Sequence, residues 1–240
     1  MKPSIVNAHR EFAPPAFETP PAYGYLHLGG AVAPPSGPPL VRKDARRSAV
    51  LARLVPLAAE LERVEAVRRV TVYCAVLVPP VGSARYDVAV LVETSSPGVL
   101  DAVRDTAQFA ALHDALTVAA SHVHLMAAHC LRSLGEVDRF RQGLFLFNHF
   151  TADDPELALA LWEHLAGWYV ARTGLDNSTL LGPVGPSDLV FVNHARWDKG
   201  LLRLAVEQFA RPSFHRYVRA NLRANKVIAM PVLYRLVTTR

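Results

Sequence analysis

The stretch RVTVYCAVLV at residues 69–78, together with RYDVAVLVE at residues 85–93, decides the fold that this sequence predicts. Both runs are rich in β-branched residues, which favour strands. The segment Pro79-Pro80-Val81-Gly82 between them is typical of a turn. We therefore expect two neighbouring strands that form a hairpin at this point of the chain.

The segments on either side of the hairpin extend this pattern. A short strand is expected over 23–28, and a helix over 46–67, where apolar residues recur at spacings of three and four. After the hairpin, Ser95, Ser96 and Pro97 supply a helix cap and a first-turn proline. A helix from there to about 116 and a strand over 122–131 complete the order β-α-β-β-α-β.

The same order recurs in the second half of the chain. Asp153-Asp154-Pro155 is a helix-start signal, Gly174 is a stop signal, and a Gly-Pro turn at 182–186 matches the turn of the first hairpin. Because the elements repeat in the same order and at a nearly constant offset, the pattern indicates a tandem repeat. The expected elements are strands over 144–150, 178–181, 188–195 and 226–236, and helices over 155–172 and 201–222.

The repeat divides the chain into an arm and two modules. Residues 1–21 contain five prolines and are expected to form an extended N-terminal arm. The modules are expected over 22–134 and 143–238. A βαββαβ unit leaves one face of its sheet bare, so we expect an α+β fold in which the two modules pack sheet to sheet, with two independent modules as the alternative.

Composition excludes several classes of protein. Of 240 residues, 51% are hydrophobic and 20% are charged, which is the balance of a globular protein. The net charge is +5 without a basic stripe, so no nucleic-acid partner is expected. Cys74 and Cys130 suggest buried thiols in a reducing compartment. Without an apolar run of membrane-spanning length or a signal peptide, we expect a cytoplasmic protein that does not bind a membrane.

Polar residues on two predicted strands of the second module are the candidates for chemistry. Asn148 and His149 are adjacent on one strand, and Asn193 and His194 on another, so each strand carries an Asn and a His on opposite faces. A buried amide or imidazole needs a partner. That partner is either a ligand in a pocket or another group of the protein, and the sequence leaves both open. Trp197 follows the second strand just before a helix, a position that commonly lines the mouth of a pocket.

The remaining motifs carry less information. The first module has only His27 and Glu93 in comparable places, so we expect the working site in the second. His122 and His124 have a chelating spacing but no third ligand, and no metal site is expected. No nucleotide-binding, zinc-protease or nucleophile-elbow motif is present.

The segment FVNHARW at residues 191–197, followed by a helix and by Pro212-Ser213-Phe214, resembles the antibiotic biosynthesis monooxygenase family of dimeric α/β-barrel (ferredoxin-like) proteins. In the cofactor-independent oxygenases of that family, an Asn and a Trp with three residues between them line a cavity for an aromatic polyketide. Asn193 and Trp197 match that spacing. A haem-degrading branch carries an Asn matched by Asn148 and a His for which His215 is an approximate candidate.

The resemblance implies an oxygenase that acts on an aromatic, polyketide-type or quinone-like molecule of secondary metabolism without a cofactor. A haem enzyme of the same superfamily, with His215 as the ligand, is one alternative. A polyketide cyclase, an isomerase or a non-catalytic binding protein is another, and a homo-oligomer is left open. The expected catalytic residues are Asn193, Trp197, His194 and His149, and the expected substrate-binding residues are Asn148, Phe191, Phe147 and Tyr217.

Overall fold

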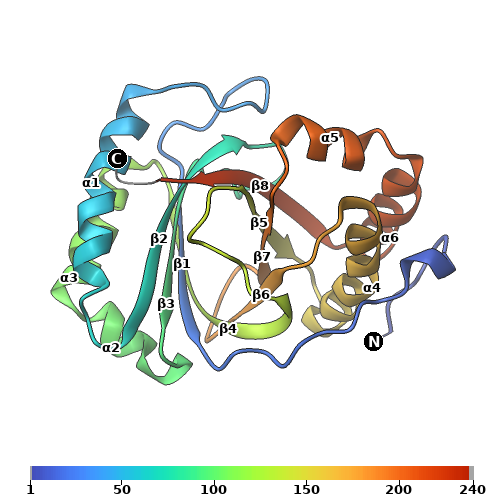
Figure 1. Cartoon of the computed structure of the whole chain (residues 1–240), viewed down its shortest axis with the longest axis horizontal. Helices are drawn as coiled ribbons and strands as arrows, with labels where there is room; N and C mark the ends of the chain where they lie inside the picture. The colour runs from blue at the N-terminus through green and yellow to red at the C-terminus, as the bar shows by residue number, and fades with distance from the viewer. Residues whose placement is uncertain (1, 238–240) are drawn as a thin grey trace.

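The computed structural model describes residues 2–237, in which the strands form one closed antiparallel barrel. Their order around the barrel is β1-β3-β2-β8-β5-β7-β6-β4. Figure 1 shows the barrel in the centre of the molecule, with helices on both sides. The strands are β1 (Gly24–Gly30), β2 (Val67–Leu77), β3 (Val88–Thr94), β4 (Val123–Gly135), β5 (Leu144–Thr151), β6 (Ser178–Pro183), β7 (Phe191–Trp197) and β8 (Ile228–Leu236).

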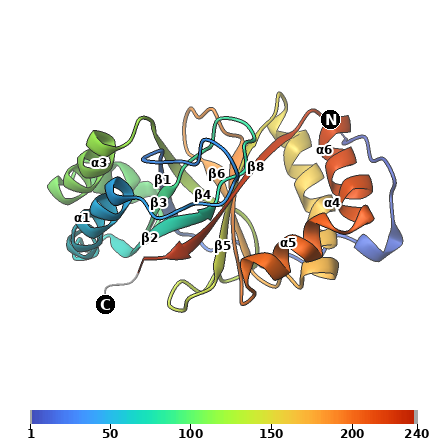
Figure 2. The same ribbon diagram turned by 90° about the horizontal axis from the view of Figure 1, so that it is seen from above.

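The helices lie in two groups outside the barrel, and Figure 2 shows the groups on opposite sides of it. The first half of the chain supplies one group and the second half supplies the other, so each half is a four-stranded sheet with helices on one face. This arrangement confirms the predicted α+β fold. The helices are α1 (Ala45–Leu61), α2 (Leu100–Arg104) and α3 (Ala107–Ala119) in the first group, and α4 (Pro155–Thr173), α5 (Leu201–Phe209) and α6 (Ala220–Ala224) in the second.

The two sheets join through their edge strands. Strand β2 pairs with β8 and β4 pairs with β6, both antiparallel. These pairings leave no free edge among the described strands, so the faces that would be bare in a single half become the inside of the barrel. The predicted packing of sheet on sheet therefore takes the form of one continuous, closed sheet.

Aromatic side chains fill the barrel. Tyr73, Phe145, Phe147 and Tyr234 are fully buried. The rings of Tyr73 and Phe147 meet edge to face at 5.1 Å, and those of Phe147 and Tyr234 at 5.5 Å. Such edge-to-face contacts are favourable, and the barrel interior is accordingly a packed core over this part of its length.

Several predicted element limits are wrong for local reasons. The helix expected over 46–67 ends at Leu61, and Val67 already pairs with Thr94 in β2. The single helix expected from 97 to 116 is a 3₁₀ turn followed by α2 and α3, because Thr106 accepts a hydrogen bond from the Phe109 N–H at 3.2 Å and so caps a new helix.

The helix expected over 201–222 is also interrupted. Helix α5 ends at Phe209, and a π-helical turn, Phe214–Arg219, leads into α6. Pro212 is the first residue of the next helical segment, and because it has no N–H it cannot continue the hydrogen bonding of α5. Strand β7 runs over 191–197 rather than 188–195, so that Trp197 is still part of the strand.

The N-terminal arm is extended apart from a 3₁₀ turn at Arg10–Phe12, and it packs on the second half of the chain. Figure 1 shows the blue arm beside α4 and α6. The Val6 N–H donates to Asn221 Oδ1 at 2.7 Å, and Asn221 Nδ2 donates to the Val6 carbonyl at 2.9 Å. Phe12 is only 3% exposed. The arm is therefore part of the folded body.

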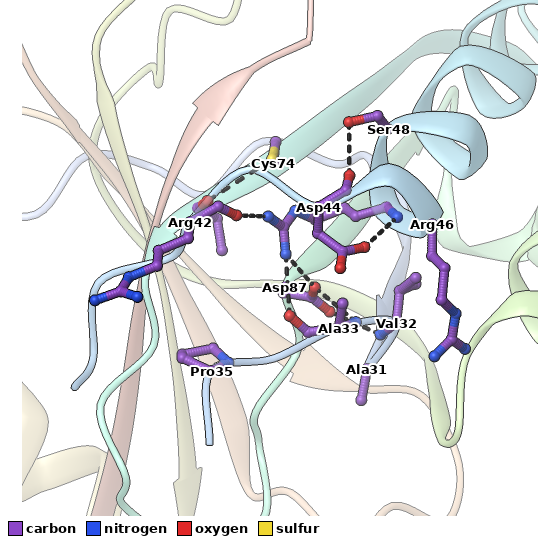
Figure 3. A network of polar contacts seen from close by, with 12 residues as sticks. Ala31, Val32, Ala33, Pro35, Arg42, Asp44, Arg46, Ser48, Cys74 and Asp87 are labelled. Carbon is purple, nitrogen blue, oxygen red and sulfur yellow. Dashed lines mark hydrogen bonds and ion pairs between the residues drawn. The ribbon is translucent and has the colours of Figure 1, made fainter. Parts of the chain in front are cut away.

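A buried ion pair fixes the long loop after β1. Asp87 accepts hydrogen bonds from the N–H groups of Val32 at 2.7 Å and Ala33 at 2.9 Å, and from Arg47 Nη1 at 2.9 Å. Figure 3 shows Asp87 facing these loop residues below the start of α1. Arg47 also donates to the carbonyl of Ala33 at 3.0 Å. The network ties the loop, α1 and the region before β3 together.

No helix within residues 2–237 is long and apolar enough to cross a membrane.

Candidate functional site

A pocket lies between the outer face of β5 and β7 and the helices of the second half. Its inner part is a narrow cavity of about 40 Å³, and an adjoining, wider outer part has a volume of about 400 Å³. The two parts share lining residues and form one continuous site. Apolar side chains dominate the inner part, as is usual for sites that bind small organic molecules. The lining residues common to both parts are Leu146, Asn148, Tyr169, Trp197, Val218, Leu222, Val227 and Ala229.

Two carboxamides lie side by side on the strand wall of this pocket. Asn148 on β5 pairs directly with Asn193 on β7, and both side chains line the inner part. They are 8% and 6% exposed. Asn148 Oδ1 is buried and has no hydrogen-bond partner among the described residues. An unpaired buried amide oxygen costs stability, so its place on a pocket wall needs an explanation.

The second carboxamide is held on one side. The hydroxyl of Ser178, on the neighbouring strand β6, donates to Asn193 Oδ1 at 2.5 Å. Ser178 is completely buried and does not line the pocket. Asn193 therefore has a defined orientation, whereas the Asn148 side chain is not fixed by such a bond.

Trp197 and Tyr169 add aromatic surface next to the amides. The Trp197 indole N–H donates to Thr173 Oγ1 at 3.2 Å, so its polar atom is satisfied by the protein. The apolar surface of the ring is left to line the pocket. Burial raises the pKa of the Tyr169 hydroxyl, which therefore stays protonated and can donate a hydrogen bond but cannot act as a base near neutral pH.

The outer part of the pocket is positive. Arg219, Arg223 and Gln208 line it, and the lining of both parts contains no carboxylate and no imidazole. Arginine donors without a neighbouring acid favour a ligand that carries negative charge or an electron-rich oxygen.

The two candidate histidines lie on the other side of the same strands, inside the barrel. His194 Nδ1 donates to the Leu146 carbonyl at 3.1 Å, and its Nε2 accepts from the Tyr73 hydroxyl at 3.2 Å. His149 Nδ1 donates to the Met230 carbonyl at 3.2 Å. Burial lowers the pKa of each to about 3, so both are neutral. Neither reaches the pocket that Asn148 and Asn193 line.

The other predicted binding residues are also outside the pocket lining. Phe147 stacks on His194 in the barrel, with ring centroids 4.3 Å apart, and Phe191 packs against Phe150 at 4.8 Å. The Tyr217 hydroxyl is 2.7 Å from His164 Nε2, and its ring lies 4.9 Å from that of Phe12 in the N-terminal arm. Tyr217 therefore helps to hold the arm.

The donor set of the pocket does not fit a haem. His215, the candidate axial ligand, lies outside the pocket lining and donates from Nε2 to the Phe209 carbonyl at 2.9 Å. Its Nδ1 faces Arg219 at 3.3 Å. The lining offers no imidazole, thiolate or thioether, and its one phenol, Tyr169, stays protonated. Within residues 2–237, no cluster of three or more His, Cys, Asp and Glu residues could hold a metal ion.

The first half has no matching amides. Leu26 on β1 pairs with Val92 on β3 in the place where Asn148 pairs with Asn193. Leu26 and Val92 are fully buried in an aliphatic cluster that fills the space below α1 and α3. The pocket lined by two asparagines is a feature of the second half.

Ser178 and Tyr169 were not among the residues singled out for a site from the sequence. Ser178 meets Asn193 only because β6 pairs with β7, with Ser178 opposite Ala195 and Leu180 opposite Asn193. Tyr169 is one of several aromatic residues on an apolar helix, where packing against the sheet is the simplest interpretation. Both residues could have been found only by knowing which face of β5 and β7 lines the pocket.

The closed barrel, built from two halves with the same strand order and with helices outside, defines the dimeric α/β-barrel fold within a single chain. No family model matches the chain, and no curated protein matches it in sequence. Solved structures share the fold. An anthrone oxidase-like protein aligns with a TM-score of 0.64 at 12% identity, over 91% of this chain and 92% of its own.

Two further structures are similar at the same level. A candidate monooxygenase from Fusobacterium nucleatum has a TM-score of 0.55 at 6% identity, covering 90% of this chain and 92% of its own. A candidate chlorite dismutase has a TM-score of 0.51 at 12% identity, covering 90% and 95%. At these identities the likeness shows the fold, and the site must be argued from its own residues.

Proposed function

We propose that this protein is an oxygenase that oxidises an aromatic, polyketide-type substrate at an acidic methylene conjugated with a carbonyl through the aromatic rings, without a bound cofactor. The observation that carries the proposal is the pair of carboxamides, Asn148 and Asn193, on the wall of an apolar pocket, where neither Nδ2 donates to another described residue. Trp197 supplies a flat surface for a ring, and the arginines of the outer part favour an anionic form of the substrate. The fold shared with an anthrone oxidase-like protein also supports the proposal of an oxygenase.

The chemistry requires an electron-rich substrate. Removing a proton from the conjugated methylene gives a delocalised enolate, whose oxygen the amide hydrogens of Asn193 and Asn148 would stabilise. The carbanion then transfers electrons to dioxygen, and a carbon–oxygen bond forms to give a hydroperoxide. Loss of water leaves a new carbonyl, so a methylene group and dioxygen become a ketone and water. The substrate itself supplies all the electrons.

The proton is expected to leave through the pocket mouth. No base lines the pocket, and His149 and His194 are on the opposite face of the sheet. Deprotonation by water or hydroxide becomes easier because hydrogen bonds to the enolate oxygen lower the pKa of the substrate. The rate should therefore rise with pH and follow the acidity of the bound substrate.

Anthrone tests the proposal directly, because it has one acidic methylene and an easily detected quinone product. The purified protein should consume oxygen with anthrone and accelerate anthraquinone formation over the buffer rate. Asn193→Ala and Trp197→Ala should each lower this rate by at least about tenfold while the circular dichroism spectrum is kept. The control Gln108→Ala, which removes an exposed amide from α3, should keep the full rate.

Two outcomes would count against an oxygenase. If the protein changes anthrone or related aromatic ketones without oxygen uptake, a cyclase or isomerase that uses the same amides replaces it. If the protein does not accelerate the oxidation at all, and Asn193→Ala lowers the free energy of unfolding without any other effect, the amides serve the fold.

A further inference from the structure

We infer that Ser178 is a positioning residue that fixes the Asn193 carboxamide, so that the pocket selects aromatic ligands carrying an oxygen acceptor. This inference rests on the proposed function in one respect, namely that the pocket is the place where the ligand binds. The starting observation is the 2.5 Å hydrogen bond from the Ser178 hydroxyl to Asn193 Oδ1.

The bond determines which atom of Asn193 is left for the pocket. A carboxamide has one acceptor oxygen and one donor nitrogen on opposite sides. Since Oδ1 faces Ser178, Nδ2 faces away from β6, and no described residue accepts a hydrogen bond from it. Asn193 is thereby fixed as a donor toward the space that it lines.

The strand pairing brings three groups together, with Ser178, which is opposite Ala195 in the register, diagonal to Asn193. Ser178 on β6 lies beside Asn193 on β7, and Asn193 lies opposite Asn148 on β5. Ser178 is buried outside the pocket, so it acts only through Asn193. Asn148 has no partner to fix its orientation, and it can turn to donate to the same ligand atom or to accept from a hydroxyl.

This arrangement predicts a specific chemical preference. A fixed N–H donor in an apolar pocket stabilises a ketone, phenolate or enolate oxygen, and it contributes nothing to a hydrocarbon of the same shape. If Ser178 lost its hydroxyl, the Asn193 carboxamide could rotate and present its oxygen instead. An oxygen acceptor on the ligand would then be repelled for part of the time.

Two probes of the same shape separate orientation from general packing. Anthrone carries the oxygen and anthracene does not, and both can be titrated under anaerobic conditions by quenching of tryptophan fluorescence. Ser178→Ala should weaken the binding of anthrone by about tenfold, the effect of one oriented hydrogen bond, and leave anthracene unchanged. Ser178→Thr, which keeps a hydroxyl, should restore anthrone binding, and Thr179→Ala on the other face of β6 should have no effect on either probe.

A measurement without ligand keeps the inference separate from the proposed function. The side-chain NH₂ signals of Asn193, assigned by their loss in Asn193→Ala, should be well resolved in the ¹⁵N spectrum of the wild type. They should shift and broaden in Ser178→Ala. Unchanged NH₂ signals in Ser178→Ala, or an equal loss of binding affinity for anthrone and anthracene, would overturn the positioning role. If the wild type binds neither probe, the proposed function fails, and the NMR result alone decides the role of Ser178.

Discussion

Asn148 carries a cost that Asn193 does not. The oxygen of Asn148 is buried without a partner, while that of Asn193 accepts from Ser178. An apolar residue of similar size should therefore be tolerated at position 148, because it removes an unpaired polar group. The same change at position 193 should leave the Ser178 hydroxyl without its acceptor.

The two asparagines can be distinguished by paired substitutions. Asn148→Leu should keep or raise the free energy of unfolding, by up to about 1 kcal/mol, and should abolish the oxidation of anthrone. Asn193→Leu should lower the free energy of unfolding by about 1 to 2 kcal/mol and should also abolish the oxidation of anthrone. Urea denaturation and oxygen uptake check both. A clear loss of stability in Asn148→Leu would show that the protein itself uses this amide.

The sequence singled out the asparagines that line the pocket, but it left undecided which face of the strands lines it. Alternation on LFLFNHF at 144–150 placed Asn148 and His149 on opposite faces, as the structure shows. Both faces of the strand are apolar because one faces the barrel interior and the other faces the helices. Hydrophobicity alone could not tell which face lines a pocket.

Among the elements, the N-terminal arm depends on a glycine of helix α4. A Cβ at Gly167 would lie 2.2 Å from the Ala13 carbonyl oxygen and 2.6 Å from that of Phe12. Gly167→Ala should therefore displace the arm and speed cleavage by trypsin after Arg10, which is exposed but lies in the docked 3₁₀ turn. Limited proteolysis followed by mass spectrometry measures this cleavage. Gly37→Ala, where a Cβ meets nothing within 4 Å, is the control, and equal cleavage of the two variants would contradict the packing of the arm.

The loop after β1 depends on the buried ion pair of Asp87 and Arg47. Asp87→Asn leaves the Arg47 charge buried without its counter-ion and should lower the free energy of unfolding by about 3 kcal/mol. Asp101→Asn, which removes an exposed ion pair with Arg104, should change it by less than about 1 kcal/mol. Urea denaturation of both variants checks the difference, and similar small losses would show that the buried pair adds no stability.

Element positions were predictable where a pattern is local, and their ends were not. The two runs at 69–78 and 85–93 are β2 and β3 to within a few residues, because β-branched runs and a proline turn act over short distances. The helix expected over 46–67 is too long since Val64 continues its spacing while packing against the cluster beside β2. The arm was predictable as extended, but its docking depends on Asn221, more than 200 residues away.

For the whole molecule, the two halves share a strand order but differ in what lies between sheet and helices. Leu26 and Val92 replace the asparagines in the first half, and its helices close over a filled core. Inside the barrel, by contrast, the two halves place similar residues in equivalent positions. His27 on β1 faces Met126, and His149 on β5 faces Met230, and the two imidazoles meet at 5.2 Å between their centroids.

This central histidine cluster should make the fold sensitive to acid. Burial, followed by the neighbouring His149 and His124, lowers the pKa of His27 well below 6.5, and burial lowers that of His149 and His194 to about 3. A lowered pKa means that the unfolded chain binds more protons. The stability is therefore full above pH 6.5 and decreases as the pH falls below it, by about 1.4 kcal/mol per pH unit for each histidine.

His27 provides the sharpest test, since neither ring nitrogen has a partner among the described residues and its ring lies 4.8 Å from Phe147. His27→Phe keeps the shape and removes one titrating group. Between pH 6 and 4, the variant should lose stability less steeply than the wild type by about 1.4 kcal/mol per pH unit, as measured by urea denaturation across that range. His113→Gln, on the outer helix layer, should not reduce the slope by this amount. An unchanged slope in His27→Phe would mean that water reaches this imidazole and that the centre of the barrel opens to solvent.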